Sequence, residues 1–147
     1  MTNKMNREVL VFTCNWNGWS CIETAINSGF KYPASVKVIK VSCLSRIHAG
    51  LMLLALDLGA DGVMLLGCES GKCHFGSNSC YVTEEHEKAQ NILKLLGIRK
   101  DMLVLVQLSA FDGSSFVKHV TKLIEDIKKT PAKTSKKAII SVSNDRV

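Results

Sequence analysis

The sequence lacks the short motifs that mark the common enzyme classes. It has no GxGxxG after a strand, no GxxxxGK[ST], no GxSxG and no HExxH. Nucleotide-binding, hydrolase and metalloprotease functions therefore have no motif to support them. Acidic side chains are also almost missing from the expected strand ends, which argues against general acid–base catalysis.

An export signal and a membrane span are not visible either. Met1–Arg7 is polar, and the apolar segment after it spans about four residues, whereas a membrane helix needs roughly 20. We therefore expect a cytoplasmic protein that does not use a membrane. In that compartment the six cysteines are expected to be metal ligands, redox thiols or core residues rather than structural disulfides.

Size and charge indicate one domain with a basic tail. The chain has 147 residues, of which 46% are hydrophobic, and this is enough for a single hydrophobic core. Much of the net charge of +6 comes from Lys128–Lys137, which holds five lysines and no acid. Because the remainder is close to neutral, we expect no nucleic-acid-binding face. The predicted domain covers residues 1–129, and residues 130–147 form a lysine-rich tail that is flexible or docks a partner.

A unit of strand, loop and helix recurs four times. The expected strands are 9–12, 36–41, 62–67 and 102–108, and the expected helices are 21–27, 45–58, 83–97 and 112–129. Ser20 and Glu23 are predicted to form a capping box for the first helix. The second helix is expected to place Ile47, Leu51, Leu54 and Leu58 on its inner face. The recurrence predicts a flavodoxin-like α/β fold, a three-layer sandwich around a parallel sheet with strand order 2-1-3-4.

The fourth strand, MLVLVQL, is too apolar for a bare edge. Two explanations stay open at this point. Residues 138–142 (AIISV) pair beside it as a fifth strand, or a partner protein covers it.

Three cysteines stand at the ends of predicted strands. Cys14, Cys43 and Cys68 follow the first three strands, and Cys73 lies in the loop after the third. In the order 2-1-3-4 these strand ends are neighbours about 4.8 Å apart, so the thiols are expected to gather. Four thiolates suit a 2Fe-2S or 4Fe-4S cluster, and also zinc. Cys21 is a fifth candidate, and the alternative for each is a buried thiol that acts as a small apolar residue.

Other side chains near these cysteines have two interpretations each. His74 is a ligand or a local hydrogen-bond partner. Trp16 and Trp19 shield a cluster from water or dock a partner protein. Arg46 and Lys72 stabilise an anionic cluster or are simply solvated charges.

Three segments resemble a known family. They are FTCNW at Phe12–Trp16, the segment Tyr32–Arg46, and GADGVMLLGCESGKCHFGSN at Gly59–Asn78. They resemble the delta, or iron-sulfur, subunit of the methyl-viologen-reducing (F420-non-reducing) hydrogenase, and the likeness covers most of Val9–Lys128. The resemblance implies a small cytoplasmic electron-transfer subunit with a 2Fe-2S cluster and no catalytic residue of its own. Such proteins pass electrons from a hydrogenase or a formate dehydrogenase to the flavoprotein (A) component of a heterodisulfide reductase complex.

The resemblance also implies a ligand set. Cys14, Cys43, Cys68 and Cys73 fall on the cysteines of the family motif, whereas Asn17 stands where the family commonly has another cysteine. Cys21 is the candidate to replace it. The alternative functions are a non-redox adaptor of the same complex that has lost the cluster, a thiol enzyme that uses Cys68 and Cys73, and a structural zinc protein.

Overall fold

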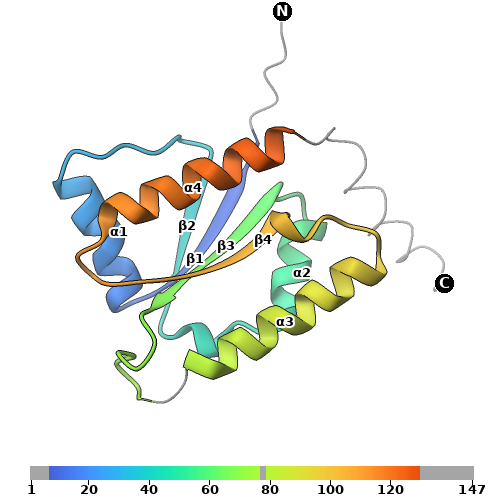
Figure 1. Ribbon diagram of the computed structural model, residues 1–147, viewed down its shortest axis with the longest axis horizontal. Coiled ribbons are helices and arrows are strands. Elements are labelled where there is room, and N and C mark those ends of the chain that lie inside the picture. The colour runs from blue at the N-terminus through green and yellow to red at the C-terminus, as the bar shows by residue number, and fades with distance from the viewer. Residues whose placement is uncertain (1–6, 77–78, 130–147) are drawn as a thin grey trace, which may run out of the picture.

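The computed structural model describes residues 7–76 and 79–129, except for the side chains of Ser79 and Cys80. Its four strands form one parallel sheet in the order β2-β1-β3-β4 (Figure 1). The strands are β1 (Val9–Cys14), β2 (Val36–Val41), β3 (Gly62–Cys68) and β4 (Leu103–Leu108). The helices are α1 (Asn17–Asn27), α2 (Ala49–Asp57), α3 (Ser79–Leu95) and α4 (Gly113–Lys128), with 3-10 turns η1 (Leu44–Arg46) and η2 (Lys100–Met102). The predicted three-layer parallel fold is confirmed.

The helices cover both faces of the sheet (Figure 1). On one face, α1 and α4 pack around a cluster that includes Ile22 and Phe116. On the other face, α2 and α3 pack around a cluster that includes Met52 and Leu93. All seven residues of β3 are buried between the two clusters, as expected for a central strand of a parallel sheet. No helix in the described ranges is long and apolar enough to cross a membrane.

Helix α4 buries the face that its sequence period predicts. Phe116, Val120, Leu123 and Ile127 are all buried, at the spacing of an amphipathic helix. Near its start, α4 comes very close to α1. A Cβ added at Gly113 would lie 2.4 Å from the backbone nitrogen of Ala25, so this contact requires glycine.

The predicted inner face of α2 is half right. Ile47 is buried and Leu51 packs against the core, but Leu54 and Leu58 are 47% and 78% exposed, while Met52 and Leu56 are buried. The segment AGLMLLALD is apolar on almost every side, so its period does not determine which face packs on the sheet. The helix also begins at Ala49, later than expected, because the His48 side chain caps it by accepting the Leu51 N–H at 3.2 Å.

Two other helices begin earlier than predicted. Helix α1 starts at Asn17 and α3 at Ser79. Ser20 therefore lies inside α1, where its N–H donates to the Trp16 carbonyl at 2.9 Å, and the predicted capping box does not form. The earlier start of α1 brings its first residues directly to the end of β1.

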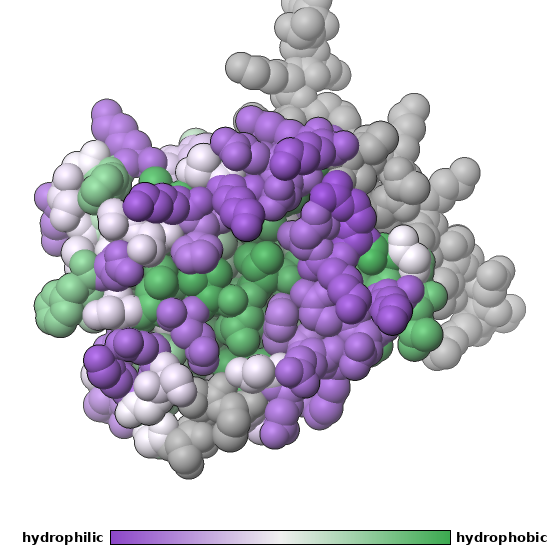
Figure 2. Space-filling model, viewed as in Figure 1, coloured by the Kyte–Doolittle hydropathy of each residue, from purple (hydrophilic) through white to green (hydrophobic). Residues whose placement is uncertain are grey.

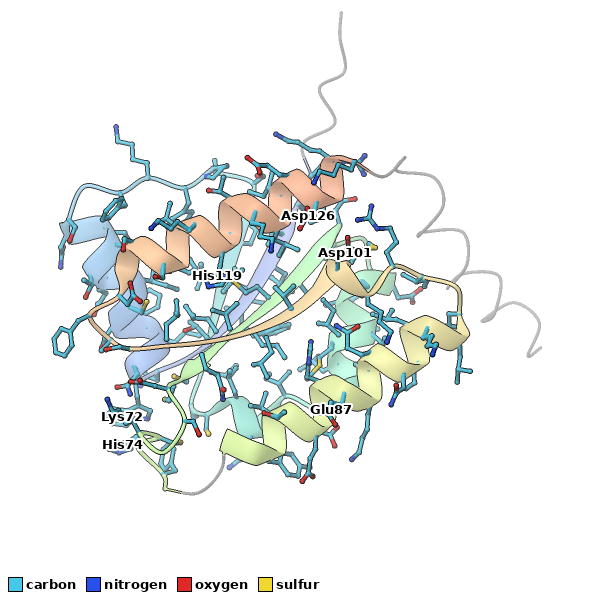
Figure 3. All side chains as sticks on the ribbon, in the orientation of Figure 1. Lys72, His74, Glu87, Asp101, His119 and Asp126 are labelled. Atoms are coloured by element: carbon cyan, nitrogen blue, oxygen red, sulfur yellow. The ribbon has the colours of Figure 1, made fainter. Side chains whose placement is uncertain are left out.

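The sheet has two unlike edges. Strand β2 carries Lys37 and Lys40, which discourage pairing with another chain, whereas β4 (LVLVQL) has no charge and pairs only with β3 among the described residues. Figure 2 shows an apolar area where β4 lies in Figure 1. A groove of about 430 Å³ runs there between β4 and α4, and Asp101, His119 and Asp126 line it (Figure 3). Residues 138–142, the predicted fifth strand, lie outside the described residues.

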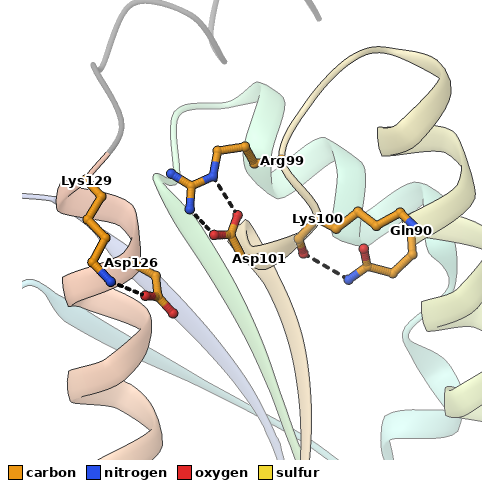
Figure 4. Close-up of polar contacts among 6 residues, drawn as sticks. All are labelled: Gln90, Arg99, Lys100, Asp101, Asp126 and Lys129. Carbon is orange, nitrogen blue, oxygen red and sulfur yellow. Dashed lines mark hydrogen bonds and ion pairs between the residues drawn. The ribbon is translucent and has the colours of Figure 1, made fainter.

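Polar contacts surround the start of β4 (Figure 4). The Gln90 side chain donates to the Lys100 carbonyl at 3.0 Å and to the Leu103 carbonyl at 2.5 Å. Arg99 pairs with Asp101, and on α4 Lys129 donates to Asp126 at 3.1 Å. The Gln90 side chain of α3 thus already bonds to the first residue of β4, while the middle of β4 borders the groove.

The contact between α1 and α4 gives a stability prediction. Gly113→Ala should lower the free energy of unfolding by about 1–3 kcal/mol, because the added methyl group overlaps the backbone of Ala25. Urea unfolding followed by circular dichroism measures the change. Glu125→Ala, an exposed site on the same helix, is the control and should change stability by less than about 0.5 kcal/mol. An unchanged midpoint for Gly113→Ala would contradict the close packing.

Candidate functional site

Two buried thiols meet at the carboxyl end of the sheet. Cys14 is the last residue of β1 and Cys68 is the last residue of β3. Because β1 and β3 are paired neighbours, the two Sγ atoms lie only 3.5 Å apart. Both cysteines are free, and their side chains are 3% and 8% exposed.

Two further thiols line the same cavity. Cys43 lies two residues beyond β2, and its Sγ accepts a hydrogen bond from Ser45 Oγ at 3.2 Å. Cys73 lies in the loop after β3. Both are half-buried. Together with Cys14 and Cys68 they surround a cavity of about 20 Å³, which has room for about one water molecule. The structure thus brings four of the five predicted ligand residues to one place.

Cys21 is not part of this arrangement. Its side chain is fully buried in the cluster on the α1 and α4 face, on the opposite side of the sheet from Cys14. There its Sγ lies 3.3 Å from the Asp112 carbonyl oxygen, to which it donates. Burial, and secondarily the Asp112 charge, raises the pKa of the Cys21 thiol to about 11.

The start of α1 supplies backbone donors to the thiol pair. The Gly18 N–H donates to Cys14 Sγ at 3.2 Å, and the neighbouring backbone N–H of Asn17 acts on Cys68, whose pKa it lowers. These two amides belong to the first turn of the helix, where backbone N–H groups have no intrahelical partner. Gly18 makes the approach feasible, because a Cβ there would lie 2.6 Å from the Leu66 carbonyl oxygen.

Burial dominates the acidity of the thiol pair in the metal-free protein. The pKa of Cys68 rises to about 12, mainly because its thiolate would be desolvated and next because of the hydrogen bond with Cys14. The Asn17 amide acts in the opposite direction and lowers this pKa, but its effect is smaller. Cys68 is therefore a neutral thiol at neutral pH, and a metal ion that bound it would displace its proton.

The loop after β3 closes over the cavity with aromatic side chains. Gly71 and Gly76 have φ values of 77° and 86°, which glycine adopts without strain. The His74 ring stacks on Trp16, with centroids 3.5 Å apart and an interplanar angle of 11°. Phe75 packs edge-on against Trp16 at 6.1 Å and also lines the cavity. Figure 3 shows Lys72 and His74 together in this loop, beside the start of α1.

The other predicted neighbours take different positions. Lys72 pairs with Glu69 at 3.0 Å on the exposed side of the loop. Arg46 lines a shallow hollow together with Cys43 and Phe75. Trp19 packs against the cluster on the α1 and α4 face and carries the Lys40 ammonium 4.5 Å from its ring centre.

The donor set fits an iron-sulfur group, although the ligands are not preassembled. Within residues 7–76 and 79–129, no three His, Cys, Asp or Glu side chains are already close enough to hold a metal ion. The 3.5 Å between Cys14 Sγ and Cys68 Sγ is close to the roughly 3.8 Å between two thiolates on one tetrahedral metal with bonds of about 2.3 Å. Cys43 and Cys73 line the same cavity from loops and would complete a four-thiolate set by moving toward the pair.

The donors to the sulfurs were not predicted from the sequence, in which Gly18 and Ser45 were not considered and Asn17 was only the position of a missing cysteine. The one available signal was Gly18 itself, since glycine is favoured where backbone must approach another group closely.

Comparison with known proteins identifies the family of this chain. Residues 9–130 match the family described as methyl-viologen-reducing hydrogenase, delta subunit. The chain belongs to this family. It is 30% identical over 128 residues to the vhc iron-sulfur (D) subunit of the F420-non-reducing hydrogenase of Methanococcus voltae, covering 87% of this chain and 89% of that protein. It is 28% identical over 129 residues to the iron-sulfur (D) subunit of the F420-non-reducing hydrogenase of Archaeoglobus profundus, covering 88% and 94%.

A second kind of relative is much longer. The chain is 29% identical over 119 residues to the A component of the ferredoxin:CoB-CoM heterodisulfide reductase of Methanosarcina mazei. The match covers 81% of this chain but only 15% of that protein. The domain described here therefore also occurs as a small part of a larger polypeptide.

The burial of the thiols predicts their order of reaction. In the metal-free native protein at pH 8, iodoacetamide should modify Cys43 and Cys73 well before Cys14, Cys21 and Cys68. The last three are buried, and the raised pKa values of Cys21 and Cys68 leave little of the reactive thiolate. Peptide mass spectrometry at timed intervals measures each site. In denaturant the modification rates of these five cysteines should become similar. If native Cys68 reacted as fast as native Cys73, the buried position of Cys68 would be contradicted.

Proposed function

We propose that this chain is a small electron-transfer subunit that carries a 2Fe-2S cluster. The observation that carries the proposal is the thiol cavity, in which the Cys14 and Cys68 sulfurs are 3.5 Å apart and Cys43 and Cys73 line the same space. Four thiolates are the usual ligands of such a cluster. The names of the relatives, which include iron-sulfur subunits of hydrogenases, support the same cofactor.

The chain's own residues have distinct parts in this function. Cys14, Cys43, Cys68 and Cys73 hold the iron, and the bound cluster supplies one-electron oxidation and reduction. The amide of Gly18 donates to the Cys14 sulfur, and such hydrogen bonds tune the reduction potential. Trp16, His74 and Phe75 limit the access of water to the cavity. Cys21, on the other face of the sheet, is not a ligand.

The relatives also suggest the partners. We propose that the chain works between a hydrogenase, or a formate dehydrogenase in its place, and a flavoprotein similar to the A component of heterodisulfide reductase. A matching segment lies inside that component in Methanosarcina mazei. This supports the second partner, because segments joined in one polypeptide in one organism often act together as separate chains in another. Electron transfer then needs no acid or base from this chain.

Metal analysis of the full chain tests the cofactor. Protein purified without oxygen should contain about two irons and about two acid-labile sulfides, and reduction should produce an electron paramagnetic resonance signal. Replacing Cys14, Cys43, Cys68 or Cys73 singly with serine should abolish or alter that signal. Cys21→Ser is the matched control and should leave the iron content and the signal unchanged.

Other outcomes identify the competing functions. Stoichiometric zinc in a colourless protein would establish a structural metal site. A chain that joins its complex without any metal would establish an adaptor. An unaltered signal in Cys43→Ser would remove Cys43 from the ligand set and contradict the proposed four-thiolate site.

A further inference from the structure

Cys73 is held from both sides by the start of α1. Lys72, directly before it, accepts a hydrogen bond on its backbone carbonyl from Asn17 Nδ2 at 3.1 Å. His74, directly after it, stacks on Trp16 at 3.5 Å. Two consecutive residues at the start of one helix thus fix the two neighbours of one cysteine, across 55 residues of sequence.

The same helix start also reaches the buried thiol pair. The amide of Gly18, the residue after Asn17, donates to Cys14 Sγ at 3.2 Å. The helix start that holds the loop through the Asn17 side chain is therefore also bonded to one sulfur of the buried pair. Since the start of α1 is itself packed against Leu66 at the end of β3, it is a fixed point from which the position of Cys73 is set.

The rest of the loop gives Cys73 little support of its own. Within residues 69–76, the described part of the loop, the internal backbone hydrogen bonds are local, from the Lys72 N–H to Glu69 and from the Gly76 N–H to Cys73, each at 3.0 Å. Gly71 and Gly76, with positive φ, bracket the segment and give it a wide range of backbone conformations once it is released. Besides the packing of Cys73 itself against the core, contacts from outside the loop hold the Cys73 sulfur beside the cavity.

We propose that Asn17 is a positioning residue that fixes Cys73 next to the Cys14 and Cys68 pair through its hydrogen bond to the Lys72 carbonyl. We call this hydrogen bond from Asn17 to the Lys72 carbonyl the tether. Its purpose, to hold a fourth sulfur for the iron, rests on the proposed function. The tether itself is a property of the metal-free chain and is tested there. Asparagine suits the role because its side-chain amide is a strong donor to a carbonyl, whereas a thiol at the same place is a weak one.

The test compares two cysteines within one molecule. In the metal-free full-length protein, Cys43 lines the same cavity as Cys73 but follows β2 and lies outside the tethered loop. Asn17→Ala should raise the ratio of the Cys73 to the Cys43 alkylation rate by about fivefold, the change that corresponds to one hydrogen bond of ordinary strength. Tryptic cleavage after Lys72 should accelerate in parallel. A general loss of stability would instead raise both alkylation rates and move their ratio toward its value in denaturant, which is measured separately.

Two further variants sharpen the comparison. Asn17→Asp removes the donor but keeps the size of the side chain, and an acidic residue in the first turn favours the helix, so it should raise cleavage after Lys72 without weakening α1. Asn17→Gln keeps the amide donor on a longer side chain. Its ratio of the Cys73 to the Cys43 alkylation rate should therefore lie between those of the wild type and Asn17→Ala. Asn27→Ala, exposed at the far end of α1, is the control and should behave as wild type.

The outcomes separate this inference from the proposed function. A wild-type alkylation ratio and wild-type cleavage in folded Asn17→Ala and Asn17→Asp would overturn the tether, whatever the iron content. A raised ratio supports it, even if the wild-type protein proves to hold no iron, in which case only the electron-carrier function would fall. In reconstituted protein that does hold iron, Asn17→Ala should lose iron to a chelator faster than Asn27→Ala does.

Discussion

The site depends on how closely the start of α1 packs against the ends of β1 and β3. Gly18 lies where any side chain would overlap the Leu66 carbonyl and the Thr13 hydroxyl. This contact lets the amides of Asn17 and Gly18 reach two sulfurs that are otherwise enclosed by apolar side chains. It also places Trp16 and Asn17 against the loop that carries Cys73. The close packing of Gly18 against the backbone of Leu66 thus determines the surroundings of Cys14, Cys68 and the loop that carries Cys73.

Much of the fold was predictable because strong patterns determine it. The apolar run of β3 and the recurring strand, loop and helix unit were enough to give the strand order, and that order alone brings Cys14 beside Cys68. The inner face of α2 was not predictable, since the helix is apolar on nearly all sides. The start of α1 was misplaced for a different reason: Ser20 and Glu23 imitate a capping box, whereas tertiary packing at Gly18 extends the helix toward β1.

The placement of Cys21 shows where sequence reasoning ends. Along the chain it lies only seven residues from Cys14, closer than any other candidate. In the fold the sheet separates the two, because Cys21 packs with α4 on one face and Cys14 belongs to the cluster on the other.

Both ends of the described chain lie at the end of the sheet where its parallel strands begin. Arg7 pairs with Asp61 just before β3, and Gly62, the first residue of β3, contacts Ile127 near the end of α4. Cys14 and Cys68 are the last residues of β1 and β3 and so lie at the opposite, carboxyl end of the sheet. The ends of the described chain and the thiol cavity therefore lie at opposite ends of the sheet. This separation suits a domain that also matches a small part of a longer protein, because its points of attachment are far from its sulfurs.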